Sequence, residues 1–217
     1  RRVHGDISPQ TPPMNLLWLL SASLILSISL SESTLAQDDA VLDTNGNKLL
    51  VGAKYAILPL VRGRGGGVTL APGNSTCSYD VAQEQLEVLR GTPVIFTPAG
   101  GKIGVVLLST DTTITFAGMG VKSNRRYNCQ SSYKWKLAPF DEEKKQTFVI
   151  AGESIGEENS GTPFKIVKTE ISYNLLFCPT CPICRFACRN VGIFTEDNGR
   201  RRLALSDVPF QVMFKKM

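Results

Sequence analysis

The chain has 217 residues, of which 42% are hydrophobic and 20% are charged, and its formal net charge is +5. These values suit one globular domain with a substantial hydrophobic core. The charge is too mild and too evenly spread to indicate nucleic-acid binding. The basic clusters at residues 125–126, 200–202 and 215–216 are therefore predicted to be solvated turns and a solvated terminus.

Residues 14–36 are predicted to be a secretory signal peptide. The apolar run that follows Met14 is too short for a membrane span, and small and polar residues continue to Ala36, after which we expect cleavage. A membrane anchor is disfavoured because no basic stop-transfer cluster follows. Residues 1–13 look like an upstream extension without a structural role. The mature domain would span residues 37–217 and be secreted, to the extracellular space or the vacuole, without a membrane attachment.

The mature chain would contain no histidine, since the only one is His4 in the upstream extension. This rules out a histidine-dependent triad, a Cys-His pair and a histidine metal site. The carboxylates at residues 141–143 stand beside two lysines in a predicted exposed turn, without a nucleophile-base pair. The sequence therefore indicates that the protein is not an enzyme, and it predicts no cofactor and no metal.

The mature region opens with a predicted hairpin. Residues 43–46 form a turn signal and residues 55–60 alternate as a strand does. Residues 63–67 form a basic, glycine-rich loop. This loop matches no phosphate-binding pattern, because it lacks both a Gly-Lys-Ser/Thr ending and a following helix, so we predict a turn. Asn74 begins a glycosylation sequon on a predicted surface turn and is expected to carry a glycan.

A loop at residues 97–105 carries one lysine at its tip. Strand-like apolar runs flank it at residues 94–96 and 105–108. Pro98 and three glycines make it unfavourable for the loop itself to pair as a strand or to form a helix. We expect it to project from a sheet-rich body, and a basic residue followed by an aliphatic one is what a trypsin-like protease accepts as a substrate. The loop consists of Thr97, Pro98, Ala99, Gly100, Gly101, Lys102, Ile103, Gly104 and Val105.

Short apolar runs separated by Gly, Asn, Asp or Pro recur along the rest of the chain. They lie at residues 114–116, 135–137, 148–150, 164–167, 173–177, 191–194, 203–205 and 210–214. With the earlier runs they make about a dozen strands, which is typical of an all-β barrel or sandwich. Only residues 81–89 have a helical look, over too short a stretch to favour a helix. A faint threefold repetition divides the chain into residues 37–95, 96–152 and 153–217.

Four of the six cysteines lie close together at residues 178–188, with the spacing C-x2-C-x2-C-x3-C. This is the ligand spacing of a bacterial iron-sulfur site. Three observations favour disulfides instead: the expected oxidising compartment, Arg189 where that motif has a proline, and the even number of the remaining cysteines.

We expect nested disulfides at the end of a hairpin and a third bond around the lysine-tipped loop. This third bond would close a ring of about 50 residues and stabilise the fold by about 4 kcal/mol on a loop-entropy estimate. The expected bonds join Cys77 with Cys129, Cys178 with Cys188, and Cys181 with Cys184.

Together these features resemble the plant Kunitz family of the soybean trypsin inhibitor type, and most of all its miraculin-like branch. The resemblance covers about residues 40–217 and implies a β-trefoil, in which three repeats of four strands form a six-stranded barrel closed by hairpins. The segments that carry it are residues 41–49, 55–57, 65–67, 191–194 and 200–210, together with the third cysteine pair.

The resemblance implies a monomeric inhibitor that binds trypsin-like serine proteases as a substrate does. The bond between Lys102 and Ile103 would be the scissile bond, with Lys102 facing a buried carboxylate in the specificity pocket. A rigid loop loses little entropy on binding, and its cleaved ends stay in place for resealing. Two departures predict weak inhibition or slow cleavage: Val51 replaces the asparagine that braces the loop in the family, and Gly100 and Gly101 add freedom.

The alternative is a non-inhibitory, miraculin-like protein with a storage, defence or taste-related role. The loop would then be a surface turn, and the loss of the bracing asparagine would be expected. A proton-triggered taste-modifying role is disfavoured because such a device needs a group that titrates near neutral pH, and the mature chain would have no histidine.

Overall fold

The computed structural model describes residues 39–73, 78–101, 104–117, 133–152, 162–178 and 188–217. Ala40–Met217 form one compact unit. The described residues contain twelve strands and no helix, so the predicted all-β class is confirmed. The strands are β1 (Lys54–Pro59), β2 (Val68–Pro72), β3 (Ser78–Gln83), β4 (Val94–Pro98), β5 (Thr112–Phe116), β6 (Trp135–Leu137), β7 (Val149–Gly152), β8 (Lys165–Lys168), β9 (Tyr173–Phe177), β10 (Arg189–Thr195), β11 (Arg201–Ser206) and β12 (Val212–Lys216).

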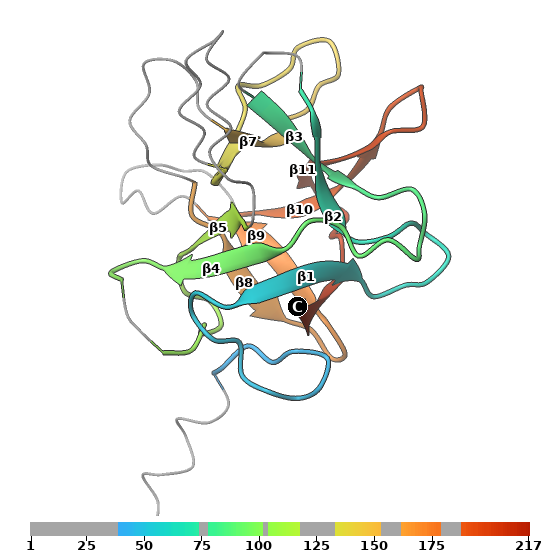
Figure 1. The fold of residues 1–217 in the computed structure, drawn as a ribbon. Coiled ribbons are helices and arrows are strands. Elements are labelled where there is room, and N and C mark those ends of the chain that lie inside the picture. Colours follow the sequence, from blue (N-terminus) through green and yellow to red (C-terminus); the bar gives the residue numbers. More distant parts are fainter. Residues whose placement is uncertain (1–38, 74–77, 102–103, 118–132, 153–161, 179–187) are drawn as a thin grey trace, which may run out of the picture. The chain divides into compact units, whose positions relative to one another are not determined.

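Six of these strands pair into a closed antiparallel barrel (Figure 1). β1 pairs with β4 and with β12, β4 pairs with β5, and β9 pairs with both β12 and β8. The ring closes between β5 and β8, where Thr112 and Phe164 exchange two backbone hydrogen bonds of 2.8 and 2.9 Å. Full closure leaves no unpaired sheet edge in the barrel, which is how small all-β folds avoid edge-to-edge association.

Three hairpins cover one end of this barrel, namely β2–β3, β6–β7 and β10–β11. β3 pairs with β11 and with β7, and a bridge between Phe148 and Ala204 joins the other two hairpins. Each set of four consecutive strands thus has a hairpin between two barrel strands, which confirms the predicted β-trefoil. The expected repeat boundary between residues 95 and 96 falls inside β4, so the first repeat runs to the end of that strand.

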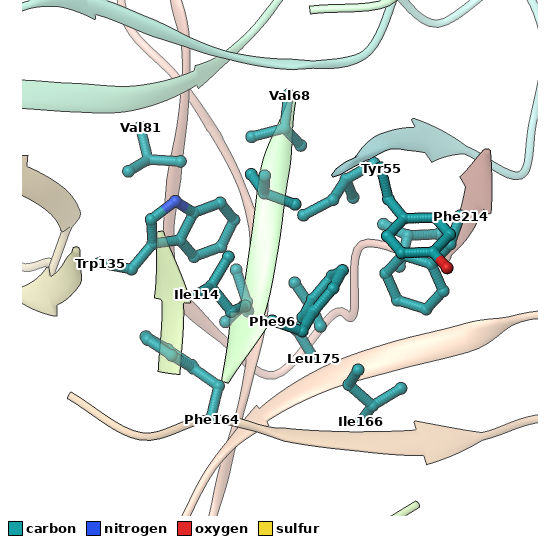
Figure 2. Close-up of a cluster of buried hydrophobic side chains, with 14 of the residues drawn as sticks. Tyr55, Val68, Val81, Phe96, Ile114, Trp135, Phe164, Ile166, Leu175 and Phe214 are labelled. Atoms are coloured by element: carbon teal, nitrogen blue, oxygen red, sulfur yellow. The ribbon is translucent and has the colours of Figure 1, made fainter. Parts of the chain in front are cut away.

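The core fills the barrel with aromatic and branched side chains (Figure 2). Inward-facing residues alternate along the strands, and Tyr55, Phe96, Phe164 and Phe214 are fully buried. The Phe96 and Phe214 rings meet edge to face with their centroids 5.2 Å apart, and Trp135 of the cap meets Phe164 in the same way at 6.0 Å. The aromatic residues therefore join the cap to the barrel in one core.

One sequence-based expectation agrees with the structure and another is wrong. As expected, residues 81–89 form no helix: residues 81–83 end β3, and turns follow, because Gly67 donates a 2.8 Å hydrogen bond to the Leu89 carbonyl and draws this segment against the glycine-rich loop. The run at residues 105–108 is not a strand; it makes single bridges, from Val105 to Leu50 and from Leu107 to Ala40.

Charged side chains are buried in the hairpin cap. The Arg202 guanidinium is 2.7 Å from one oxygen of Asp80 and 3.2 Å from Glu196, while Arg200 lies 2.7 Å from the other Asp80 oxygen. Lys144 adds a 2.8 Å pair to Glu196. Only 6% of Arg202 and 4% of Asp80 are exposed. The expectation that residues 200–202 form a solvated turn is therefore wrong for Arg202, whose charge is matched by partners on other segments.

We expect the contribution of Glu196 to the stability of this cap to fall in acid. Burial raises the pKa of Glu196, but hydrogen bonds from Lys144 and Arg202 outweigh this and hold the pKa below its ordinary value. A lowered folded-state pKa contributes stability above the unfolded value, about 4.3, that is lost as the pH falls through the folded value. Urea unfolding of the wild type and of Glu196→Gln should differ by about 1 kcal/mol at neutral pH and converge near pH 3. A difference that does not change with pH would contradict this expectation.

Candidate inhibitory loop

The incoming side of the lysine-tipped loop is fixed by β4. Five residue pairs join β4 to β5, from Val94 opposite Phe116 to Pro98 opposite Thr112. Beyond the last pair, the Ala99 amide donates a 2.7 Å hydrogen bond to the Asp111 carbonyl. The chain is therefore held by a continuous ladder up to the third residue before Lys102.

The outgoing side is fixed by a different part of the chain, at residues 49–51. The Val51 amide donates a 2.9 Å hydrogen bond to the Gly104 carbonyl, and Val105 bridges to Leu50. The Tyr55 hydroxyl in turn accepts a 2.9 Å hydrogen bond from the Leu50 amide, which ties this support to β1. Gly104 directly follows the predicted scissile pair, so the loop is fastened to the barrel on both sides of that pair.

Between these two supports the chain turns through glycines. Gly100 and Gly101 have φ angles of +83° and +64°, in the left-handed region that favours glycine, and the Gly101 amide lies 3.3 Å from the Pro98 carbonyl. Thr97, Ala99 and the two glycines are exposed. Lys102 and Ile103 lie outside the described residues.

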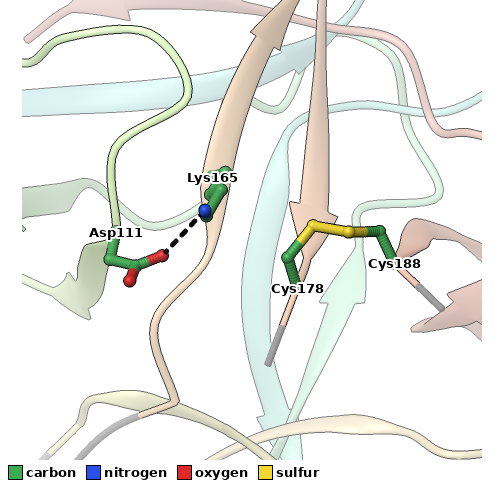
Figure 3. Close-up of a disulfide and its surroundings, with 4 residues drawn as sticks. All are labelled: Asp111, Lys165, Cys178 and Cys188. Carbon is green, nitrogen blue, oxygen red and sulfur yellow. Dashed lines mark ion pairs between the residues drawn. A yellow bond between two sulfur atoms is a disulfide. The ribbon is translucent and has the colours of Figure 1, made fainter. Parts of the chain in front are cut away.

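Figure 3 shows an ion pair formed by Asp111, which follows the loop in the chain, and a disulfide at the end of β9. Asp111 Oδ1 is 3.6 Å from Lys165 Nζ of β8, and Lys165 lies opposite Leu176 of β9 in the sheet register. Two residues further on, Cys178 at the end of β9 forms a disulfide with Cys188 at the start of β10, with an S–S distance of 2.06 Å. Asp111, whose carbonyl holds the incoming strand, is thus connected to a cross-linked part of the barrel.

Removing the Lys165 charge should loosen this support. Both side chains of the pair are about a quarter exposed, so we expect Lys165→Met to cost only about 0.5 to 1 kcal/mol. The Ala99 amide should then exchange its hydrogen about three times faster with solvent, because its acceptor belongs to Asp111. Amide exchange followed by NMR measures this. Lys168→Met, at the exposed end of the same strand, is the control and should leave that amide unchanged.

The structure describes most residues of the predicted loop, but several other predicted site residues lie outside the part of the chain that it describes. The predicted loop residues on both sides of Lys102 and Ile103 are described, and the Cys178 to Cys188 bond is present. The remaining predicted modification and cross-link sites lie outside the described residues: Asn74, Cys77, Cys129, Cys181 and Cys184. Sequence reasoning considered only the side chain of Val51 as a possible brace and missed the support that its backbone gives. The Val51 side chain packs against the core, while its backbone amide contacts the loop.

Side chains of the types that bind metals are not gathered at one place among the described residues. No group of three His, Cys, Asp or Glu side chains among them is placed to hold a metal ion. Cys178 and Cys188 are bonded to each other, so neither sulfur is available as a thiolate ligand for an iron-sulfur cluster. In the same part of the chain, no helix has the length and hydrophobicity needed to cross a membrane.

Comparison with known proteins places this loop and barrel in a family. A Kunitz family model described as trypsin and protease inhibitor matches residues 41–216. Kunitz trypsin inhibitor 5 of Arabidopsis thaliana is 42% identical over 207 residues, 91% of this chain and 97% of the relative. Miraculin of Synsepalum dulcificum is 38% identical over 209 residues, 89% and 92% of the two chains. The solved structure of a Kunitz-type trypsin inhibitor from Cicer arietinum is 34% identical with a TM-score of 0.68, over 82% of this chain and 99% of that one. The chain therefore belongs to the plant Kunitz family of trypsin and protease inhibitors.

Proposed function

We propose that this protein is secreted as a monomer and inhibits a trypsin-like serine protease. The loop at residues 97–105 enters the active site as a substrate does, with Lys102 in the specificity pocket and the bond between Lys102 and Ile103 over the catalytic serine. The lysine ammonium is a compact charge that pairs with the carboxylate of such a pocket. In this proposal the protease is the partner, and no nucleic acid or membrane is involved. The family model that matches this chain is described as trypsin and protease inhibitor, so the chain is not an enzyme.

The main support for this proposal is that both ends of the loop are hydrogen-bonded to the barrel. Ala99 is held through Asp111 and Gly104 is held through Val51, by backbone hydrogen bonds of 2.7 and 2.9 Å. If the protease cuts between these two points, the new ends remain attached to the barrel and stay close enough to rejoin. A loop already held in one conformation also loses little entropy when it binds. The same two supports would therefore slow the release of the cleaved product.

A non-inhibitory role is the second candidate, and the structure contains one observation in its favour. The Val51 side chain packs against the core and has no polar group to offer the loop. Among the described residues, the turn at Gly100 and Gly101 is supported by backbone hydrogen bonds, from the Ala99 amide to the Asp111 carbonyl and from the Gly101 amide to the Pro98 carbonyl. A relative named miraculin lies at 38% identity, which is compatible with such a role.

Titration of trypsin with the chain from Gln37 onward tests the proposal. We expect stoichiometric loss of activity at micromolar concentrations, with an intact chain and a chain cut after Lys102 in equilibrium on the enzyme. Mass spectrometry of the mixture identifies the cut. If trypsin retains full activity and cleaves the chain rapidly and completely after Lys102, the loop is a substrate and the proposal fails. If the chain is neither cut nor inhibitory, the non-inhibitory candidate gains support.

Restoring the missing brace should strengthen inhibition. Val51→Asn places an amide, with two N–H donors, next to the segment that already contacts Gly104. We expect the inhibition constant for trypsin to fall about threefold to tenfold, equivalent to one additional hydrogen bond. Because the Val51 side chain is partly buried, the melting temperature should be measured alongside, and Val51→Thr is the control without an amide. An unchanged inhibition constant in a folded Val51→Asn variant would contradict this expectation.

A further inference from the structure

A pocket lies at the end of the barrel opposite the lysine-tipped loop. β1 and β4 run antiparallel, so the loop after Pro59 and the loop after Pro98 leave the barrel at opposite ends (Figure 1). The pocket lies beside the first of these loops, has a volume of about 340 Å³, and is bordered by β10, β11 and the chain leading into β12. This volume is at the small end of the range typical of ligand sites, about 300 to 1,000 Å³. Its apolar walls are formed by Pro59, Val61, Ile193, Val208, Pro209 and Phe210.

Two arginines supply the charge of this pocket. Arg64 and Arg201 both line it, together with the uncharged Thr195 and Gln211. Among the described residues, no acidic side chain lines the pocket, and neither arginine has an ion-pair partner. Among the described residues, the side-chain hydrogen bond of Arg201 uses Nε, which leaves its terminal N–H groups available. A pocket with apolar walls and two unmatched guanidinium groups has a positive potential that favours an anion.

A buried glutamine fixes the positions of both arginine-bearing segments. Gln83 is only 3% exposed. Its Oε1 accepts a 2.8 Å hydrogen bond from Arg201 Nε, and its Nε2 donates hydrogen bonds of 2.9 and 3.0 Å to the carbonyls of Arg64 and Gly66. One side-chain amide therefore connects β11 to the glycine-rich loop, and the two sides of the pocket are held at a fixed separation.

Close backbone packing explains the glycines of the loop at residues 63–67, and this packing also determines where Arg64 lies relative to the pocket. A Cβ atom added to Gly67 would lie 2.0 Å from the Arg90 carbonyl oxygen, so this backbone approaches the following segment too closely for any side chain. Gly66 likewise donates a 2.7 Å hydrogen bond to the Glu84 carbonyl. The glycines pack the loop flat against residues 84–90, and this leaves Arg64 at the edge of the pocket.

We propose that this pocket binds a small organic anion, a carboxylate carried on an apolar body. The guanidinium groups of Arg64 and Arg201 bind the carboxylate, which matches their planar donor geometry. The walls that include Val61, Val208 and Phe210 cover the apolar body. The site lies at the other end of the barrel from Pro98, where the lysine-tipped loop leaves β4, so it operates whether or not the chain inhibits a protease.

Calorimetric titration of the chain with 2-naphthoate tests this proposal, with 2-naphthamide as the neutral probe of the same shape. We expect one naphthoate per chain, bound about tenfold more tightly than the amide. Arg64→Gln should weaken naphthoate binding about fivefold to tenfold, and because Arg64 is exposed the fold should be unaffected. Arg62→Gln removes the same charge two residues away, from a side chain that does not line the pocket, and should leave the affinity unchanged.

A second variant locates the site independently of the arginines. Val208 is 76% exposed and lines the pocket, so Val208→Asp adds a carboxylate there without disturbing the core. Naphthoate affinity should fall about tenfold, whereas naphthamide affinity should change little. Three results would each overturn the proposal: no heat of binding for naphthoate, equal binding of acid and amide, or equal weakening by Arg62→Gln and Arg64→Gln. Trypsin titration of Arg64→Gln should match the wild type, which separates this site from the proposed inhibitory loop.

Discussion

Replacing Lys102 with alanine should abolish the inhibition of trypsin. The lysine is the only basic residue in the loop at residues 97–105, and in the proposed complex its ammonium group meets a buried carboxylate. Truncating one partner of such a pair leaves the other charge buried and unpaired, which costs about 4 kcal/mol, or about a thousandfold in the inhibition constant. The measurement is a trypsin titration with each variant at equal concentration.

Two controls accompany Lys102→Ala. Lys102→Arg keeps a positive charge that reaches the same carboxylate and should inhibit within about tenfold of the wild type. Arg62→Ala removes a charge from the exposed loop after β1, at the opposite end of the barrel, and should have no effect. If Lys102→Ala inhibits as strongly as the wild type, another part of the molecule contacts the protease and the assignment of the scissile bond is wrong.

Much of the barrel could be predicted because most of its strands are recognisable from their own local sequence pattern. The runs at residues 135–137 and 173–177 coincide with β6 and β9, since apolar residues that alternate between turn residues specify a half-buried strand locally. The sequence does not predict β2, although Val68 and Leu70 alternate with polar or small residues, because the strand follows a run of glycines and ends at a proline. Turn residues close to a short strand hide its pattern.

The supports of the loop could not be predicted in the same way. The contact from Val51 to Gly104 is made by a backbone amide, which is present at every residue other than proline and leaves no mark in the sequence. The contact between Asp111 and Lys165 joins the residue just before β5 to β8, two segments that are distant in sequence, and neither residue stands out by its local pattern. Sequence reasoning could locate a loop with a lysine, but only the folded barrel shows what holds its two ends.

The buried charges of the cap are a similar case and lead to the largest expected loss of stability. Arg202 Nη2 donates to an Asp80 oxygen that is 122 positions earlier in the sequence, and its guanidinium lies 3.7 Å from the centroid of the Phe148 ring. Local context suggested a solvated basic turn, because a run of three arginines is usually exposed. Only the pairing of β11 with β3 brings Arg202 beneath the cap and next to its acidic partner.

Replacing Arg202 with methionine should cost about 3 to 5 kcal/mol in the free energy of unfolding, because it leaves Asp80 buried with only one of its two cations. Methionine keeps an apolar side chain over Phe148, so most of the loss is electrostatic and not a cavity effect. Urea unfolding measures the difference. Arg189→Met is the matched control: its partner Asp207 is almost fully exposed, and the expected loss is below about 1 kcal/mol.

The pH dependence of that loss distinguishes a buried charge from a packing defect. Burial raises the pKa of Asp80 by more than Arg202 and Arg200 lower it, and without Arg202 the pKa should rise further. A raised folded-state pKa contributes stability that is present below the unfolded value and is lost as the pH rises through the folded value. The variant should therefore be least stable relative to the wild type at neutral pH, and the gap should narrow as Asp80 takes up a proton in acid. A gap that stays constant with pH would mean that Arg202 acts through its packing on Phe148 and not through its charge.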